Sequence, residues 1–463
     1  MSKVKGLVSA FNANIDAVVK VSGESIRKLI EEHHLDINNV IQGGERCIQS
    51  TEDAVRGLIH CFRNGIAEEW LIEDITVFNW LQENLGYDKL QMGGQGGIVA
   101  NVMAVCDVNP VYVHCASLPA EQAGLFLDLE NLQTTDSNGK FSQANKTVRA
   151  DEIPLIHWII EFDVNDKLLL GDLEIQCPKS NRFIATYDPL NFKLAIDPHF
   201  AKAVSDPENH LEYVILSGYQ MLKEQLTDDT KGADRIEDSM HIIDTWKENH
   251  PGAILHLEMA STQDSVMRKH LLDTLAKKVD SLGFNERELI DLLEVMGEDE
   301  LAKICLEETN SANLFRAMVK VQAFTGCPRL QLHMFGLYLT VQIKEFRITP
   351  LQNRNGMQLA ATIAAAKAGT GAINTKDVLL WATGRTVSDV GLNELSALSR
   401  ELSDSGITDK SGQIRRDDNL INTGLTEFNN LDVIAVPTIL IDKPITLVGM
   451  GDTISSISLV AAN

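Results

Sequence analysis

Residues 91–116 read QMGGQGGIVANVMAVCDVNPVYVHCA, a turn, a helix and a strand in direct succession. The glycine-rich start leads into an apolar run over residues 97–106, and a short β-branched and aromatic segment follows over residues 111–116. Helical runs that alternate with short apolar strands are typical of layered α/β proteins. This stretch therefore predicts one unit of an α/β fold.

The same alternation continues on both sides of this stretch. Short apolar segments between polar or turn residues predict strands, and longer periodic segments predict helices. We therefore predict a large α/β/α domain around a mostly parallel sheet. The further predicted strands are GLVSAF (6–11), EYVILS (212–217), AILHLEMA (253–260), LQLHMF (330–335) and VIAVPTILI (433–441), and the further predicted helices are HIIDTWKENH (241–250), RELIDLLEVM (287–296) and LAATIAAAKAG (359–369).

Residues 149–191 show a different pattern. IHWIIEF (156–162) and NRFIATYD (181–188) predict strands with few helical turns between them. We interpret them as part of a smaller, mainly β element that packs on the large domain. The length of 463 residues also exceeds the size at which one hydrophobic core usually stops growing, which favours two domains.

The net charge argues against two classes of partner, and the cysteine spacing indicates the redox state of the thiols. The formal net charge is −24, which repels nucleic-acid phosphates and anionic lipids, so we expect neither nucleic acid nor membrane as a partner. The seven cysteines are scattered without CxxC spacing, which predicts reduced thiols. There is no apolar signal core at the start and no run long enough to span a bilayer, so we expect a soluble, cytoplasmic protein.

The tail ITLVGMGD, residues 445–452, predicts a strand, a tight turn at Gly449 and Gly451, and then a helix with Ile454, Ile457 and Val460 on one stripe. Glycines let the backbone approach a ligand, and the amides of a first helical turn attract an anion. A carboxylate beside that anion could take the proton of a hydroxyl, as phosphoryl transfer to an alcohol requires. The alternative is a capped helix start with Asp452 near the helix dipole.

Two further stretches predict ligand contacts. Four glycines surround Gln95, which suits a backbone pressed against a small polar ligand, and a flexible turn is the alternative. In the extended stretch FNANIDAVV, residues 11–19, Asn12, Asn14 and Asp16 share one face. Three hydrogen-bonding side chains in a row suit a polyhydroxy ligand, although a solvated strand face gives the same pattern.

Two carboxylates are candidates for a metal or its water. His256 and Glu258 share a face of a predicted strand, and a buried glutamate is costly unless it is paired or near a metal. An edge strand is the alternative. Asn285 and Glu288 lie three residues apart at a helix start, which primarily indicates a capping box. A capped helix can still present Glu288 to a metal-bound water.

Together and in order, these motifs resemble the archaeal ADP-dependent sugar kinases, the glucokinase and phosphofructokinase group of the ribokinase-like superfamily. No single motif is specific, but the resemblance covers nearly the whole chain. The matching motifs are NxNxD (Asn12, Asn14, Asp16), GGQxG (Gly93 to Gly97), a strand ending in Glu161 and Phe162, NRFI (Asn181 to Ile184), HxE (His256, Glu258), NxxE (Asn285, Glu288) and GxGD (Gly449 to Asp452).

The resemblance implies a ribokinase-like fold, an ADP-dependent kinase that releases AMP, and a role for each motif. Asp452 is implied as catalytic base, with the backbone from Gly449 to Gly451 as the anion hole. Glu258 and Glu288 are implied as holders of Mg²⁺, through waters. The implied sugar contacts are Asn14, Asp16, Glu69, Gly94 and Gln95, with Glu68 as the alternate to Glu69 and His157 as a weaker candidate.

Further implied contacts concern the phosphates and the adenine. Arg182 is expected to meet a phosphate of ADP or of the sugar, and Asn285, Val436 and Pro437 to lie on the nucleotide side. The segment between Phe162 and NRFI lacks the expected lysine–glycine pattern, so Arg149 or Lys146 is an alternative source of charge. In this family a glutamate at the position of Glu69 goes with glucose use, which favours a bifunctional enzyme acting on glucose and fructose 6-phosphate.

The expected large domain comprises about residues 90–145 and 210–463, and a discontinuous lid comprises about 10–75 and 149–195. The protein is expected to be a monomer or a small homo-oligomer. Two alternatives stay open: an ATP-dependent ribokinase-like sugar or nucleoside kinase, and a non-catalytic sugar or nucleotide sensor. The HxE and NxxE pair argues against the first, and the presence of Asp452 argues against the second.

Overall fold

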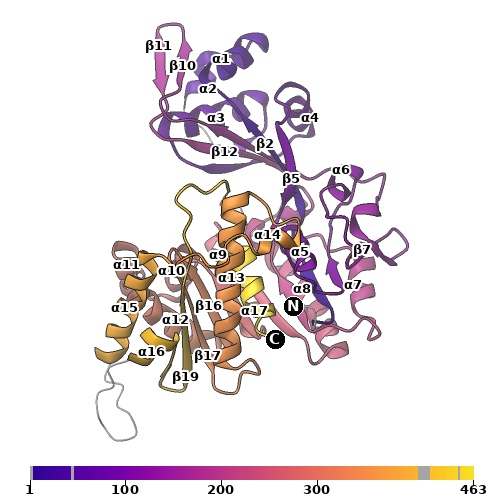
Figure 1. Cartoon of the computed structure of the whole chain (residues 1–463). Helices are drawn as coiled ribbons and strands as arrows, with labels where there is room; N and C mark the ends of the chain where they lie inside the picture. The colour runs from indigo at the N-terminus through magenta and orange to yellow at the C-terminus, as the bar shows by residue number, and fades with distance from the viewer. Residues whose placement is uncertain (1–3, 43–45, 405–417, 447–448) are drawn as a thin grey trace, which may run out of the picture.

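A sheet of 11 strands forms the centre of the larger body (Figure 1). The structure is a computed structural model and describes residues 4–42, 46–404, 418–446 and 449–463. Neighbouring strands are parallel from β16 to β7, and the pairs outside this range are antiparallel. In spatial order the strands are β18 (Leu425–Phe428), β19 (Leu431–Pro437), β17 (Leu337–Ile343), β16 (Arg329–Met334), β15 (Ser281–Phe284), β14 (Ile254–Glu258), β13 (Tyr213–Leu216), β1 (Leu7–Ala10), β6 (Val111–Val113), β7 (Leu132–Thr135) and β8 (Phe141–Gln143).

Helices cover both faces of this sheet, so the predicted three-layer α/β/α arrangement is confirmed. The first face packs against α7 (Pro198–Val204), α8 (Gly232–Asn249), α9 (Ser265–Asp273), α10 (Glu286–Met296), α11 (Asp299–Glu307), α12 (Ser311–Thr325), α15 (Asp389–Asp404) and α16 (Asp418–Thr423). The second face packs against α5 (Gln95–Val105), α6 (Ala120–Ala123), α13 (Pro350–Thr370), α14 (Lys376–Leu379) and α17 (Met450–Val460).

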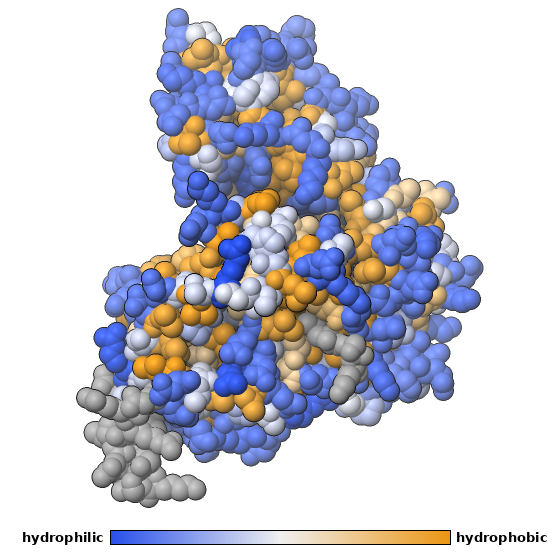
Figure 2. All heavy atoms as spheres, viewed as in Figure 1, coloured by the Kyte–Doolittle hydropathy of each residue, from blue (hydrophilic) through white to orange (hydrophobic). Residues whose placement is uncertain are grey.

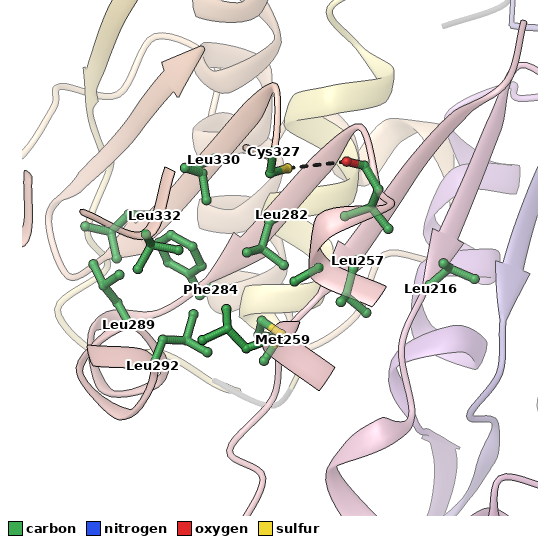
Figure 3. Close-up of a cluster of buried hydrophobic side chains, with 14 of the residues drawn as sticks. Leu216, Leu257, Met259, Leu282, Phe284, Leu289, Leu292, Cys327, Leu330 and Leu332 are labelled. Atoms are coloured by element: carbon green, nitrogen blue, oxygen red, sulfur yellow. Dashed lines mark hydrogen bonds between the residues drawn. The ribbon is translucent and has the colours of Figure 1, made fainter. Parts of the chain in front are cut away.

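Alternation along β14 decides which side chains face which layer. Leu257 and Met259 join the apolar cluster on the first face, together with Leu282 and Phe284 from β15 (Figure 3). Side chains of a strand alternate between the two faces. His256 and Glu258 therefore point to the second face, toward α17.

A second sheet of six strands forms the smaller body, and helices cover one of its faces (Figure 1). Apolar side chains such as Trp158 and Phe183 pack under these helices. The strands in spatial order are β3 (Cys47–Ile48), β4 (Glu68–Ile72), β12 (Asn181–Tyr187), β9 (Ile156–Phe162), β2 (Asn14–Lys20) and β5 (Lys89–Gly93). The helices are α1 (Gly23–Glu32), α2 (Ile37–Ile41), α3 (Thr51–Asn64) and α4 (Ile75–Asn84). A hairpin of β10 (Lys167–Leu170) and β11 (Leu173–Gln176) projects beyond these helices.

The chain passes between the two bodies four times, after β1, after β5, after β8 and after β12. The expected start of the large domain near residue 90 falls inside β5, which pairs with β2 in the smaller sheet. Each predicted strand and helix outside the tail coincides with an observed element of the same type. Within the part of the chain that the structure describes, no helix is long and apolar enough to cross a membrane.

The tail departs from the predicted strand and turn. Ile445 and Thr446 lie outside any strand, and residues 447–448 lie outside the described part of the chain. The helix α17 already begins at Met450, so Gly451 is helical. Gly449 is the N-cap in the left-handed region, with φ 61°, and this conformation, which glycine adopts readily, lets the helix begin two residues earlier than predicted.

Candidate active site

The carboxyl edge of the parallel strands gathers several predicted site residues. Asn12 follows β1, Glu258 ends β14 and Asn285 follows β15, and Gly218, which no sequence motif singled out, follows the intervening strand β13. These strands are adjacent and parallel, so their carboxyl ends meet at the same edge. Open α/β sheets bind ligands in the crevice outside this edge, which makes it the first candidate site.

A polar row crosses the face of the smaller sheet that the helices leave uncovered. Asp16 of β2 pairs in register with His157 of β9, which in turn pairs with Thr186 of β12. Glu69 of β4 accepts a hydrogen bond from the Thr186 hydroxyl, with Oε1 2.7 Å from Oγ1. The same Oε1 lies 3.8 Å from His157 Nδ1. The strand pairing thus assembles a cluster of side chains far apart in sequence.

A cleft separates the two bodies (Figure 2), and Glu69 of the polar row lines a cavity within it. This cavity has a volume of about 620 Å³. Glu68 and Glu69 of β4 both line it from the smaller sheet, while the loops after β13 and β14 line it from the large body. A ligand in this cleft would therefore touch both bodies at once.

Glu68 and Glu69 point to opposite sides of β4. Glu68 lies on the helix side, where its Oε2 accepts a hydrogen bond of 2.9 Å from Trp70 Nε1 and its Oε1 lies 3.1 Å from Arg46. Glu69 lies on the polar-row side. Both carboxylates line the cavity, but only Glu69 contacts the polar row, through Thr186 and His157, which favours Glu69 over Glu68 as the sugar contact.

The GGQ turn packs tightly against the NxNxD strand. A side chain at Gly94 would come within 2.6 Å of Oδ1 of both Asn12 and Asn14, so only glycine fits there. Both of these oxygens are buried and lack a hydrogen-bond partner. Buried acceptors are usually satisfied, and two neighbouring exceptions beside a cleft indicate a place for a donor from a ligand. Gln95 is the first residue of α5, directly after this turn.

The charges of the polar row depend on one another. Burial raises the pKa of Asp16, and the charge of His157 opposes this rise. Burial alone would lower the pKa of His157, but Asp188, Glu69 and Asp16 together raise it. Asp188 is buried and its Oδ2 lies 3.0 Å from His157 Nε2. Protonated His157 would thus balance the carboxylates of this row.

The expected sources of positive charge differ in their surroundings. Arg182 of β12 is exposed and lies in register with Glu161, on the uncovered face of the sheet. Arg149 is instead in ion pairs with Asp197, at 2.7 Å, and with Glu152, at 2.9 Å. Lys146 lies 3.2 Å from Asp128. The contacts of Arg149 and Lys146 therefore favour Arg182 as the cation that meets a phosphate.

Glu258 sits in a buried polar pocket on the second face of the large sheet. Its Oε2 lies 3.1 Å from His256 Nε2, and its Oε1 lies 3.6 Å from His333 Nε2. Burial lowers the pKa of His256, with a further lowering by the charge of Arg329, and burial lowers the pKa of His333 to about 4. The edge-strand alternative for β14 is wrong, because β13 and β15 flank it.

Asn285 and Glu288 form the predicted capping box at the start of α10. Glu288 N donates to Asn285 Oδ1 at 2.9 Å, and Asn285 N donates to Glu288 Oε2 at 2.8 Å. Glu288 is only 8% exposed. A carboxylate that caps its helix through one oxygen can still serve a metal-bound water through the other.

Helix α17 begins at the same edge of the large sheet and is held by α13. Lys367 Nζ donates to the Gly449 carbonyl at 2.8 Å and to Thr453 Oγ1 at 3.0 Å. A side chain at Gly451 would come within 2.7 Å of His333 Nε2. Asp452 is the third residue of this helix, and its side chain lies outside the described part of the structure.

Val436 and Pro437 end β19, which runs antiparallel to β17 and therefore parallel to β16. Their strand end thus lies at the same edge as the carboxyl ends of β14 and β15. Val436 is 5% exposed and packs in the second-face core. The expected contact of Val436 and Pro437 with the adenine stays a prediction.

Sequence reasoning missed several residues of this site. Asp188 and Arg329 carry no recognisable spacing, and strand pairing alone brings them to His157 and Ser281. Lys367 had a signal, because it is a lone charge in the alanine-rich run of α13. Among the described residues, no group of three or more His, Cys, Asp or Glu side chains is arranged to hold a metal.

Comparison with known proteins shows what this chain is similar to. A family model described as "ADP-specific Phosphofructokinase/Glucokinase conserved region" matches residues 5–461. The ADP-specific phosphofructokinase of Methanosarcina acetivorans is 27% identical over 463 residues, which cover 98% of this chain and 92% of the relative. The ADP-dependent glucose/glucosamine kinase of Pyrococcus furiosus is 30% identical over 471 residues, which cover 98% and 93%.

Two solved structures extend this similarity to three dimensions. The last common ancestor of ADP-dependent phosphofructokinases from Methanosarcinales has a TM-score of 0.86 and 31% identity, covering 99% of this chain and 94% of that one. An ADP-dependent kinase in complex with fructose-6-phosphate and ADPbetaS has a TM-score of 0.81 and 30% identity, covering 100% and 94%.

Proposed function

Because this chain belongs to the ADP-specific phosphofructokinase/glucokinase family and has its ribokinase-like fold, we propose that it transfers the β-phosphoryl group of ADP to a sugar hydroxyl and releases AMP. The acceptor sugars are glucose, fructose 6-phosphate or both. The observation that carries the proposal is the polar row of the smaller sheet, which faces the carboxyl edge of the large sheet across a cleft.

The sugar binds to the smaller sheet and the GGQ turn. Asn14, Asp16 and Glu69 supply hydrogen bonds to its hydroxyls, and Gly94 and Gln95 bring the backbone of the turn close. The unpartnered Oδ1 atoms of Asn12 and Asn14 support this assignment, because a sugar hydroxyl is a donor that would satisfy them. Arg182 meets a phosphate from the same face.

The phosphoryl group is transferred at the start of α17. The backbone at Gly449 and Gly451 forms the anion site, since the first amides of a helix point toward an anion. Asp452 takes the proton of the attacking hydroxyl. The adenine lies near Val436 and Pro437, and Asn285 lies on the nucleotide side of the same edge.

Mg²⁺ fits the carboxylates at this edge. Glu258 lies where Gly283 leaves room for its carboxylate, since a side chain at Gly283 would overlap Glu258 Oε2. Mg²⁺ keeps several waters and needs few protein oxygens, which suits Glu258 and Glu288 in the absence of a larger described cluster. When bound, the ion neutralises charge that develops on the phosphates.

Closure of the smaller body over the large one would exclude water from the cleft. The phosphoryl group would then reach the sugar hydroxyl in preference to water. The cavity lined by both bodies supports this motion, because a ligand there contacts each of them. The active species is a cytoplasmic monomer or small homo-oligomer that needs no nucleic acid or membrane.

The test measures AMP release by the full chain with Mg²⁺ and ADP, separately with glucose and with fructose 6-phosphate. Turnover on both sugars is expected, and ATP in place of ADP should support little or none. Turnover with ATP alone would favour the ATP-dependent kinase alternative. Asp452→Asn should lose orders of magnitude in kcat yet still bind ADP, and unchanged activity would remove Asp452 as the base.

A further inference from the structure

A buried polar layer lies between the large sheet and the tail helix α17. It contains Ser281 of β15, Arg329 of β16, His256 of β14 and Ser455 of α17, and all four are fully buried. Sheet and helix layers normally meet through apolar side chains. Buried polar groups are costly unless hydrogen-bonded, so a layer of this kind needs a specific purpose.

Arg329 is the charged member of this layer. Its guanidinium donates to Ser281 Oγ at 2.9 Å and to Asn353 Oδ1 at 3.1 Å, and it also donates to Gln331. All three acceptors are neutral, and burial lowers the pKa of Arg329 to about 10. Burial of a cation with no carboxylate among these acceptors costs folding free energy, so a role in folding alone does not account for Arg329.

The hydrogen bonds of the layer have a fixed direction. A guanidinium can only donate, so Ser281 Oγ accepts from Arg329. The single hydroxyl proton of Ser281 can then point to His256 Nδ1, which lies 2.9 Å away. At the other end of the ring, an ionised Glu258 carboxylate can only accept, so His256 Nε2 donates to Oε2 in that state. This series of hydrogen bonds runs from Arg329 through Ser281 and His256 to Glu258.

This series of hydrogen bonds restricts the position of the Glu258 carboxylate. Ser455 Oγ also lies 3.0 Å from His256 Nε2, which ties the ring to α17. A side chain at Gly283 would overlap Glu258 Oε2 and Ser455 Oγ, so the group is closely packed. The ring of His256 is therefore held at both nitrogens, and through it one carboxylate oxygen is held as well.

We propose that Arg329 and Ser281 are positioning residues that, through His256, hold the Glu258 carboxylate in the orientation that binds a divalent cation. The inference rests on the proposed role of Glu258 as a metal carboxylate. Partners that orient a metal-binding group from behind typically change metal affinity about 10–100-fold when they are removed. Neither residue touches the cation or the substrates.

The test uses Mn²⁺ as the probe and measures free Mn²⁺ by electron paramagnetic resonance, with the full chain, saturating ADP and no sugar. Ser281→Ala is expected to weaken Mn²⁺ binding about tenfold or more, and ADP affinity without metal should stay unchanged. Ser239→Ala is the matched control, because Ser239 is equally buried but bonds to Tyr219. Arg329→Met should weaken Mn²⁺ binding in the same direction, and Arg329→Lys should restore part of it.

The outcomes separate this inference from the proposed function. Parental Mn²⁺ affinity in Ser281→Ala would overturn the inference, and so would an equal loss in Ser239→Ala, which would indicate general loosening. Glu258→Gln tests the proposed metal role itself. If Glu258→Gln weakens Mn²⁺ binding and Ser281→Ala does not, the positioning inference alone fails. If Glu258→Gln binds Mn²⁺ like the parent, the metal role of Glu258 fails, and the inference fails with it.

Discussion

Lys367 reaches from α13 to the carbonyl of Gly449, with Nζ 2.8 Å from the oxygen, across 82 positions of the chain. The same ammonium donates to Thr453 Oγ1. Two contacts from one buried cation thus fix the N-cap residue of α17 and one residue in its first turn. The backbone that we assign to the phosphoryl group is therefore held by a residue far away in the sequence.

Replacement of Lys367 should lower kcat by more than a loss of folded protein would explain. Lys367→Met removes both hydrogen bonds from a charged donor, each contributing about 1.5–3 kcal/mol. We expect kcat to fall at least about tenfold, which corresponds to about 1.4 kcal/mol in the barrier. The measurement is steady-state AMP release at a temperature where the variant is folded. Lys376→Met is the control, since Lys376 is exposed and pairs with Asp107, and equal losses in both variants would contradict the prediction.

Glu69 should decide the use of glucose. Glu69→Gln keeps the shape but removes the charge beside Thr186 and His157, and we expect kcat/KM for glucose to fall about 10–100-fold, as loss of a charged hydrogen bond predicts. Fructose 6-phosphate should be affected less. Glu68→Gln, the neighbour on the helix side of β4, should change neither value. A larger effect of Glu68→Gln would reassign the sugar contact.

The ion pair of His157 and Asp188 should make stability depend on pH. Burial opposes protonation of His157, but the carboxylates raise its pKa above the ordinary 6.5. The stabilisation is complete below the unfolded pKa and is lost as the pH rises through the folded pKa. The difference in free energy of unfolding between the parent and Asp188→Asn should therefore be larger at about pH 6 than at about pH 9.

Urea unfolding at both pH values measures this difference. The imidazole signals of His157 followed by NMR provide an independent check, because Asp188→Asn should lower the pKa of this ring. A stability difference that stays constant between the two pH values would show that the pair does not titrate as described.

Gly283 should not tolerate a side chain. In Gly283→Ala the new methyl group would overlap Glu258 Oε2 and Ser455 Oγ, and overpacking of this kind costs about 1–3 kcal/mol. We expect a lower melting temperature and a weaker affinity for Mn²⁺. Gly252→Ala is the control, because no atom lies within 4 Å of its added carbon. Unchanged Mn²⁺ affinity in Gly283→Ala would mean that the pocket adjusts to the methyl group.

Much of this fold could be predicted because the local pattern of apolar and polar residues marks its strands and helices. The strands around Leu7, Tyr213 and Leu257 are short apolar runs, and their period and boundaries suffice to predict them. The tail was harder, because the sequence ITLV reads as a strand while the left-handed Gly449 starts a helix at once. Neither residue type nor spacing reveals which of these two local preferences prevails.

The candidate site was predictable to the extent that its motifs are contiguous. Asn14 with Asp16, and His256 with Glu258, are neighbours on one strand, so alternation alone places each pair on one face. Asp188, Arg329 and Lys367 lack such a spacing. Their roles arise from strand register and helix packing, which join segments more than 20 residues apart.

The four passages of the chain between the two bodies have a consequence for synthesis on the ribosome. The strand β1 emerges almost first, but one of its two partners, β13, ends only at Leu216. The smaller sheet cannot close before β12 is complete at Tyr187. Neither body is a contiguous unit that folds ahead of the other. A nascent chain must hold its first strand unpaired on one side through nearly half of translation, and an unpaired strand edge of this kind is prone to aggregation.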